Sequence, residues 1–180
     1  NELHCHLVRG QEGNNAPEPE LLAQLARADS HDIAAGYGLS FPNHPEAPAA
    51  DLVETASQVL AAQSHSDFPK AAVSVSDALW RDDADRLAQL AAELGTASPE
   101  ATTAAIEAGT AKRRELKHYS GAMFYYGGEW YWGVDRLYHL EARLAALGAD
   151  TQPGTPLIAP RPSEDLAGQR DTGQFTLELY

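Results

Sequence analysis

The sequence predicts an α+β protein in which helices predominate. Alanine-rich stretches place apolar residues at helical spacing over most of residues 18–118. Two short aromatic runs, residues 123–126 and 130–132, flank the pair Gly127-Gly128. Two glycines supply the positive φ angles of a two-residue turn, and aromatic residues favour strands. We therefore expect one β-hairpin in an otherwise mostly helical chain.

The remaining elements follow from periodicity and from glycine and proline positions. Residues 1–9 alternate as in a strand, with Leu3, Cys5 and Leu7 on one face. A helix is predicted from Pro17 or Pro19 to about Ala35. Further helices are predicted at residues 51–63, 67–80, 83–94, 99–108, 110–118 and 135–147. Stops are expected at Gly36 or Gly38, at Gly95 and at Gly148.

Composition argues against several classes of partner. The chain of 180 residues carries 26 acidic and 13 basic residues, a net charge of −13. Such a balance repels phosphate backbones and anionic lipid surfaces, so neither nucleic acid nor a membrane is expected as a partner. With Cys5 as its one cysteine, the chain cannot form an internal disulfide. No apolar run approaches the length of a membrane span, and a cytoplasmic protein is expected.

The spacing His4-x-His6 is the most metal-like pattern in the sequence. Alternate residues of a strand point the same way, so both imidazoles could reach one ion. The surrounding ELHCHL resembles the start of adenosine-deaminase-type metal hydrolases over about six residues. The rest of the chain lacks the alternating strands and helices of that barrel. A metal hydrolase is therefore the weaker alternative, and no metal is expected. Cys5 is expected to be an inert, inward-facing thiol.

The hairpin and the residue that follows it are candidates for both structure and binding. Aromatic strands are most often core, although their density here also suits the floor of a ligand site. Asp135 is expected to cap the helix at 135–147. A free helix N-terminus can also hold an anionic or zwitterionic ligand, with Asp135 accepting a hydrogen bond from its ammonium group.

Two stretches resemble the DsbA-like thioredoxin superfamily, closest to kappa-class glutathione transferases and 2-hydroxychromene-2-carboxylate isomerases. The hairpin matches at Phe124, Gly128-Glu129, Trp132-Gly133 and Asp135-Arg136-Leu137, and the helical block at Asp29, Ala34, Gly38 and Phe41-Pro42. The resemblance covers residues 1–148. It implies a thioredoxin-like sheet with an all-helical insertion at about 18–118.

The resemblance also implies that the chain is a middle piece of a two-domain member. The family's first strand and first helix, which carry its catalytic Ser or Cys, are missing here, so no catalytic residue is assigned. Residues 149–173, rich in proline and glycine, are expected to be a linker. Residues 174–180 alternate as a strand. This strand either begins a second DsbA-like domain or fills the empty first-strand position.

By resemblance, the site residues for glutathione are Gly121, Ala122 and Asp135. Ala122 stands where the family has a cis-proline, and Val134 where it often has a polar residue. The implied function is a DsbA-family thiol oxidoreductase or a glutathione-dependent isomerase or transferase acting on a small-molecule thiol or electrophile, with this segment inactive alone. A homodimer, or pairing with a second DsbA-like domain, is expected. The alternative is a non-catalytic thioredoxin-like module for dimerisation or scaffolding.

Overall fold

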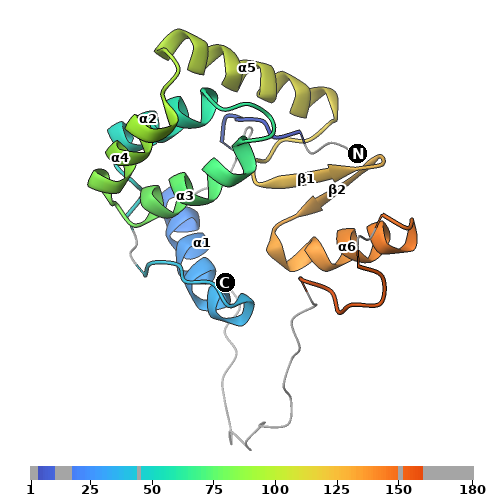
Figure 1. Cartoon of the computed structure of the whole chain (residues 1–180). Helices are drawn as coiled ribbons and strands as arrows, with labels where there is room; N and C mark the ends of the chain where they lie inside the picture. Colours follow the sequence, from blue (N-terminus) through green and yellow to red (C-terminus); the bar gives the residue numbers. More distant parts are fainter. Residues whose placement is uncertain (1–3, 11–17, 44–45, 150–151, 160–180) are drawn as a thin grey trace, which may run out of the picture. The chain divides into compact units, whose positions relative to one another are not determined.

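A computed structural model of the chain describes residues 4–10, 18–43, 46–149 and 152–159 (Figure 1). The chain divides into two compact units, Asn1–Ala122 and Met123–Tyr180. The first unit contains α1 (Pro19–Ala34), the 3-10 helix η1 (Ala35–Tyr37), α2 (Ala50–Ala61), α3 (Phe68–Trp80), α4 (Ala84–Leu94) and α5 (Pro99–Glu115). The second contains β1 (Met123–Tyr126), β2 (Glu129–Trp132), the 3-10 helix η2 (Val134–Arg136) and α6 (Leu137–Ala146). The α+β class, with helices predominating, is confirmed.

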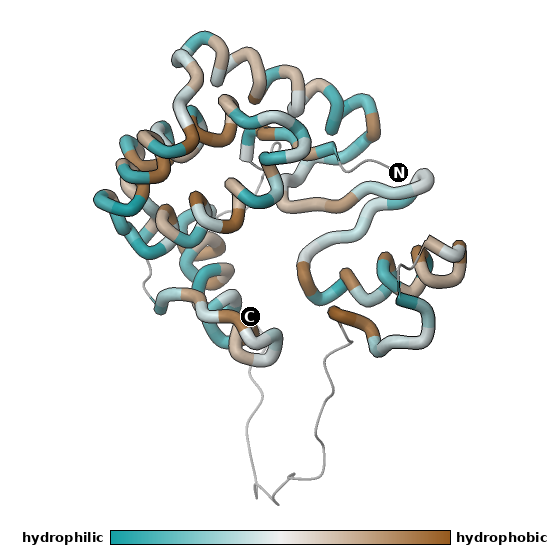
Figure 2. The backbone as a smooth tube through the Cα atoms, in the orientation of Figure 1, coloured by the Kyte–Doolittle hydropathy of each residue, from teal (hydrophilic) through white to brown (hydrophobic). Residues whose placement is uncertain are grey.

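The hydrophobic core lies in the first unit, where α2, α3 and α4 pack against one another. Its most deeply buried side chains are Val59, Val75 and Leu87, at 0%, 0% and 1% exposure. Each comes from a different one of these helices, whose apolar residues colour the tube brown in Figure 2. The apolar spacing that predicts these helices therefore marks the faces that are buried.

Local signals set the helix ends. Asp83 accepts a hydrogen bond from the Arg86 amide at the start of α4, and Ser98 accepts one from the Ala101 amide at the start of α5. Gly95 ends α4, as expected. Gly38 adopts a left-handed conformation after η1 with φ of 67°, which a glycine reaches without a steric penalty.

Two expectations for the first unit are wrong. The predicted helices at 99–108 and 110–118 are one continuous helix, α5, with Gly109 in its interior. Residues 4–9 form no strand and instead run along α5. The amide of Arg9 donates to Thr110 Oγ1 at 2.9 Å, and the Arg113 guanidinium donates to the Arg9 carbonyl at 2.8 Å. Side chains of a helix thus satisfy backbone groups that a sheet was expected to pair.

The predicted hairpin is confirmed in the second unit. Strands β1 and β2 pair antiparallel, with Phe124 opposite Tyr131 and Tyr125 opposite Trp130. Gly127 and Gly128 form the turn with φ of 56° and 92°, and two positive φ angles in succession are the requirement of a type I′ hairpin turn. Within the described residues this hairpin is the whole sheet.

The helix predicted at 135–147 forms, but it begins later than expected. Residues Val134–Arg136 make a 3-10 turn, and α6 follows from Leu137. Asp135 therefore lies inside η2 and does not cap α6, where Arg136 occupies the N-cap position without a side-chain cap. Gly148 follows α6 with φ of 69°, as its predicted role as a stop requires.

The segment beyond α6 is described only in part. Residues 152–159, within the predicted linker, form turns and bends without a helix or strand. The carboxylate of Glu141 accepts hydrogen bonds from the amides of Ile158 and Ala159 at 2.7 and 2.9 Å. The predicted strand at 174–180 lies outside the described residues. Among the residues described, no helix has the length and apolar character needed to cross a bilayer.

Candidate functional site

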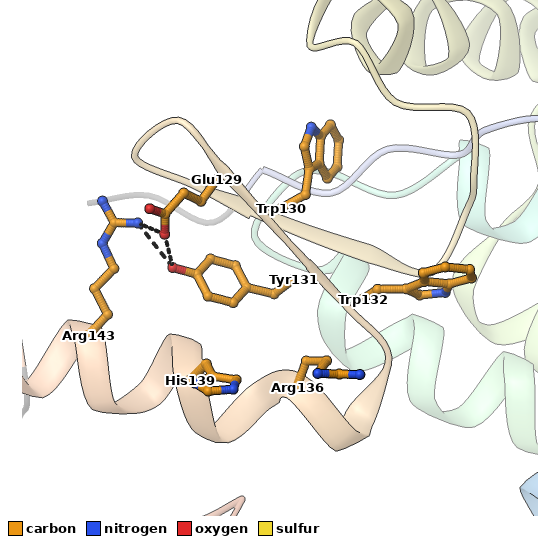
Figure 3. Close-up of a pocket in the computed structure, with 7 residues that line it drawn as sticks. All are labelled: Glu129, Trp130, Tyr131, Trp132, Arg136, His139 and Arg143. Atoms are coloured by element: carbon orange, nitrogen blue, oxygen red, sulfur yellow. Dashed lines mark hydrogen bonds and ion pairs between the residues drawn. The ribbon is translucent and has the colours of Figure 1, made fainter.

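An open pocket of about 530 Å³ lies in the second unit, where β2 and α6 face each other (Figure 3). Strand β2 contributes aromatic and acidic side chains, and the end of η2 and α6 contribute basic ones. The lining residues are Glu129, Trp130, Tyr131, Trp132, Arg136, His139 and Arg143.

A hydrogen-bonded network joins the strand to the helix across one end of the pocket. Arg143 donates to Tyr131 Oη at 3.0 Å and also pairs with the carboxylate of Glu129. Tyr131 Oη donates in turn to Glu129 Oε2 at 2.9 Å. Figure 3 shows the three side chains converging. Arg143 also donates to the Gly127 carbonyl at 3.3 Å, so a single guanidinium holds both the turn and the second strand of the hairpin.

Strand alternation explains why these side chains meet. Residues 129 and 131 lie on the same face of β2, and Tyr126, opposite Glu129, shares that face. The Arg143 guanidinium lies 5.5 Å from the centre of the Tyr126 ring, within the range of a cation–π contact. Tyr131 is 8% exposed and is the buried anchor of this face.

The pocket lining is more basic than the protein as a whole. Two arginines and a histidine from η2 and α6 face one carboxylate, Glu129, in a chain of net charge −13. The hydrogen bond that Arg143 donates to Tyr131, together with the charge of Glu129, raises the pKa of Arg143 above its ordinary value, so this guanidinium stays charged. Arg136 pairs with its neighbour Asp135 at 3.2 Å in an exposed ion pair. Exposed pairs are weak, so an anionic ligand can compete for Arg136.

The three site residues implied by the resemblance fall in different units. Gly121 and Ala122 end the first unit, and Asp135 lies in η2 of the second. Among the described residues no peptide bond is cis, and Ala122 has a positive φ of 52°. Asp135 does not line the pocket itself, but its ion-pair partner Arg136 does.

The histidine and cysteine candidates lie in the first unit. No group of three or more His, Cys, Asp or Glu side chains in the described part of the chain is arranged to hold a metal ion. Burial raises the pKa of the half-buried Cys5 thiol, which favours the protonated, unreactive form. His4 and His6 instead meet a third histidine, His65.

Sequence reasoning missed Arg143, His139 and Tyr131 as pocket residues. A signal for the two helix residues was present, because positions 136, 139 and 143 follow the i, i+3, i+7 spacing of one helix face. That spacing becomes informative only once the aromatic strand is known to lie over the same face.

Comparison with known proteins gives no relative: no protein-family model, curated protein or solved structure matches this chain.

Proposed function

We propose that this chain is a thioredoxin-like binding module whose second unit binds glutathione, a small thiol with two carboxylates and one ammonium group. The observation that carries the proposal is the convergence of Arg136 and His139 with the aromatic strand β2 in one open pocket. Charged donors recognise carboxylates strongly, and aromatic surfaces take the apolar part of a ligand. The resemblance of the hairpin to glutathione-dependent proteins supports the same ligand class.

The pocket residues take different roles in this proposal. Arg143 is a positioning residue, because its guanidinium is already held by Glu129 and Tyr131. Arg136 and His139 are the donors to the ligand carboxylates. Asp135, beside Arg136, accepts from the ammonium group at the γ-glutamyl end of the ligand. Opposite charges at adjacent positions thus match the zwitterionic end of glutathione.

Binding without chemistry is proposed for this segment. A thiol-dependent reaction needs a stabilised thiolate, and partial burial raises the pKa of the Cys5 thiol, which favours its protonated form. An oxidoreductase, isomerase or transferase reaction then belongs to a longer protein, in which a further strand and helix provide the catalytic Ser or Cys. In that protein this segment provides the ligand-binding side of the site.

A calorimetric titration with glutathione tests the proposal. We expect millimolar or tighter binding, weakened about three- to tenfold by Arg136→Gln, because one charge-assisted hydrogen bond is lost. Asp135→Ala should weaken binding by a similar factor. The matched control is Arg86→Gln, which removes an exposed arginine of α4 that pairs with Glu93 at 3.5 Å. Absence of binding to the wild-type chain, or equal loss in Arg86→Gln, would reject the proposal.

A non-catalytic module for dimerisation or scaffolding is the second candidate. The observation in its favour is that aromatic side chains are exposed on the hairpin face opposite Glu129 and Tyr131. On that face Tyr125 is 43% and Trp132 is 55% exposed. Exposed aromatic residues are frequent at protein interfaces. Sedimentation analysis of the wild-type chain and of Tyr125→Ser, which does not line the pocket, tests this candidate: a dimer lost in the variant supports it, and a monomeric wild type rejects it.

A further inference from the structure

Residues 4–9, here called the strap, are bound to α5 by specific backbone contacts. The Arg9 amide and carbonyl pair with Thr110 and Arg113 of that helix. Thr110 is 2% and Arg113 is 4% exposed, so the strap contacts α5 through buried polar side chains. Val8 lies against Gly121, because a Cβ added to that glycine would be 3.5 Å from Val8 Cγ2.

Three histidines meet where the strap approaches the loop after α2. The ring centroids of His4 and His65 are 5.3 Å apart, and those of His6 and His65 are 6.1 Å apart. Both pairs have edge-to-face geometry, with interplanar angles of 78° and 71°. His4 and His6 belong to the strap, whereas His65 belongs to the helical body. Any charge on these rings therefore acts between the strap and the loop after α2, beside the contacts that hold the strap on α5.

Among the other charged groups near this cluster, Lys112 adds repulsion, and the nearby glutamates offset it only in part. Lys112 of α5 acts on His6, and Glu115 partly neutralises that lysine through an ion pair at 3.1 Å. Further along the strap, Arg9 pairs with Glu107 at 3.5 Å. Both ion pairs are exposed and therefore weak. No group among these places a carboxylate between the imidazoles.

Protonation turns the attraction between these rings into repulsion. Neutral imidazoles pack edge to face, whereas imidazolium rings repel one another. Partial burial of the ring, then repulsion by His65, His4 and Lys112, lowers the pKa of His6. A histidine whose pKa is lowered in the docked state binds a proton more readily when the strap is released. Docking is therefore unopposed above the ordinary histidine pKa of about 6.5, and it is weakened as the pH falls below that value.

We propose that the strap is an acid-sensitive latch, in which protonation of His6, packed against His65 and close to His4 and Lys112, releases residues 4–9 from α5 as the pH falls below about 6.5. Release removes Val8 from Gly121 and breaks the hydrogen bonds of Arg9 with Thr110 and Arg113. The helical core of α2, α3 and α4 remains folded, because its buried residues include no histidine. The latch does not depend on the glutathione proposal, because its residues all belong to the first unit.

Amide hydrogen exchange measured across this pH range, corrected for the intrinsic exchange rate, tests the latch. The reporter is the Arg9 amide, which is protected only while it donates to Thr110. We expect its opening constant to rise roughly fourfold for each pair of like charges formed at the cluster distance in water. The Val59 amide, in the core, serves as the reference for global unfolding and should not change.

Two substitutions at His65 make opposite predictions. His65→Gln removes the ring that both strap histidines face and should reduce the pH dependence, leaving the part that arises from burial of His6 and from His4 and Lys112. His65→Lys supplies a permanent charge and should raise the opening constant already at pH 7.5. His139→Gln, in the second unit, is the control and should retain the wild-type profile. An Arg9 profile that is flat in the wild type, or that is unchanged in His65→Gln, would overturn the latch.

Discussion

Gly109 lies directly beneath the backbone carbonyl of Leu7: a Cβ at position 109 would stand 2.0 Å from the Leu7 oxygen and 3.1 Å from His6 Cβ. Real carbon–oxygen contacts are far longer, so any side chain at this position must displace the strap. This contact explains a glycine in the interior of α5, where it is unfavourable by about 0.5–1 kcal/mol relative to alanine.

Gly109→Ala is therefore expected to detach the strap while leaving α5 intact. Overpacking against backbone costs about 1–3 kcal/mol, more than the helix gains from alanine. Amide exchange should show loss of protection at Arg9, and circular dichroism should show unchanged helix content. The matched control is Gly36→Ala, since a Cβ there meets no atom within 4 Å. Retained protection at Arg9 in Gly109→Ala would contradict the close contact.

Lys117→Gly is expected to stabilise the chain by about 0.5–1 kcal/mol. Lys117 follows the end of α5 with φ of 64°, a left-handed conformation that glycine reaches without steric penalty. The Lys117 amide donates to the Arg114 carbonyl, and the His118 amide donates to the Arg113 carbonyl, as in a Schellman motif. Urea unfolding measures the change. Lys112→Gly, within the helix, should instead destabilise by about 1 kcal/mol, and a stabilising effect there would invalidate the comparison.

Tyr131→Phe is expected to destabilise the chain by about 1–2 kcal/mol, because its hydroxyl bonds to two charged side chains. The ring stays buried, but Arg143 loses one acceptor and Glu129 loses one donor. Urea unfolding followed by tryptophan fluorescence, in a Trp80→Phe background so that the signal comes from Trp130 and Trp132, measures the loss. Tyr125→Phe is the control, since Tyr125 is 43% exposed and packs its ring on Trp130. Equal effects of the two substitutions would show that the network contributes nothing.

Features that depend on neighbours in sequence could be predicted. The pair Gly127-Gly128 predicts the hairpin turn because positive φ angles are a property of glycine itself. Gly95 and Gly148 mark helix ends for related reasons, and Ser98 followed by Pro99 marks a start. The apolar spacing within α2, α3 and α4 predicts the buried faces, since each face is defined by one helix alone.

Features that depend on residues far apart in the sequence could not be predicted. Asp135 has the chemistry of an N-cap, but the backbone turns through η2 and places α6 two residues later. Alternation at residues 4–9 has the pattern of a strand, yet partners on α5 satisfy the backbone of this segment. Gly109 has the pattern of a helix stop, and only the carbonyl of Leu7 reveals its role as a contact.

By itself, then, the sequence determined the α+β class, the hairpin and most helix boundaries, because glycine torsions, caps and apolar periodicity act within a few residues. The tertiary structure alone decided that Arg143 joins Tyr131 and Glu129, and that His65 meets the histidines of the strap. Those side chains are separated by many residues along the chain. Their meeting depends on how α6 packs on β2 and how the strap crosses α5, which is a property of the folded backbone.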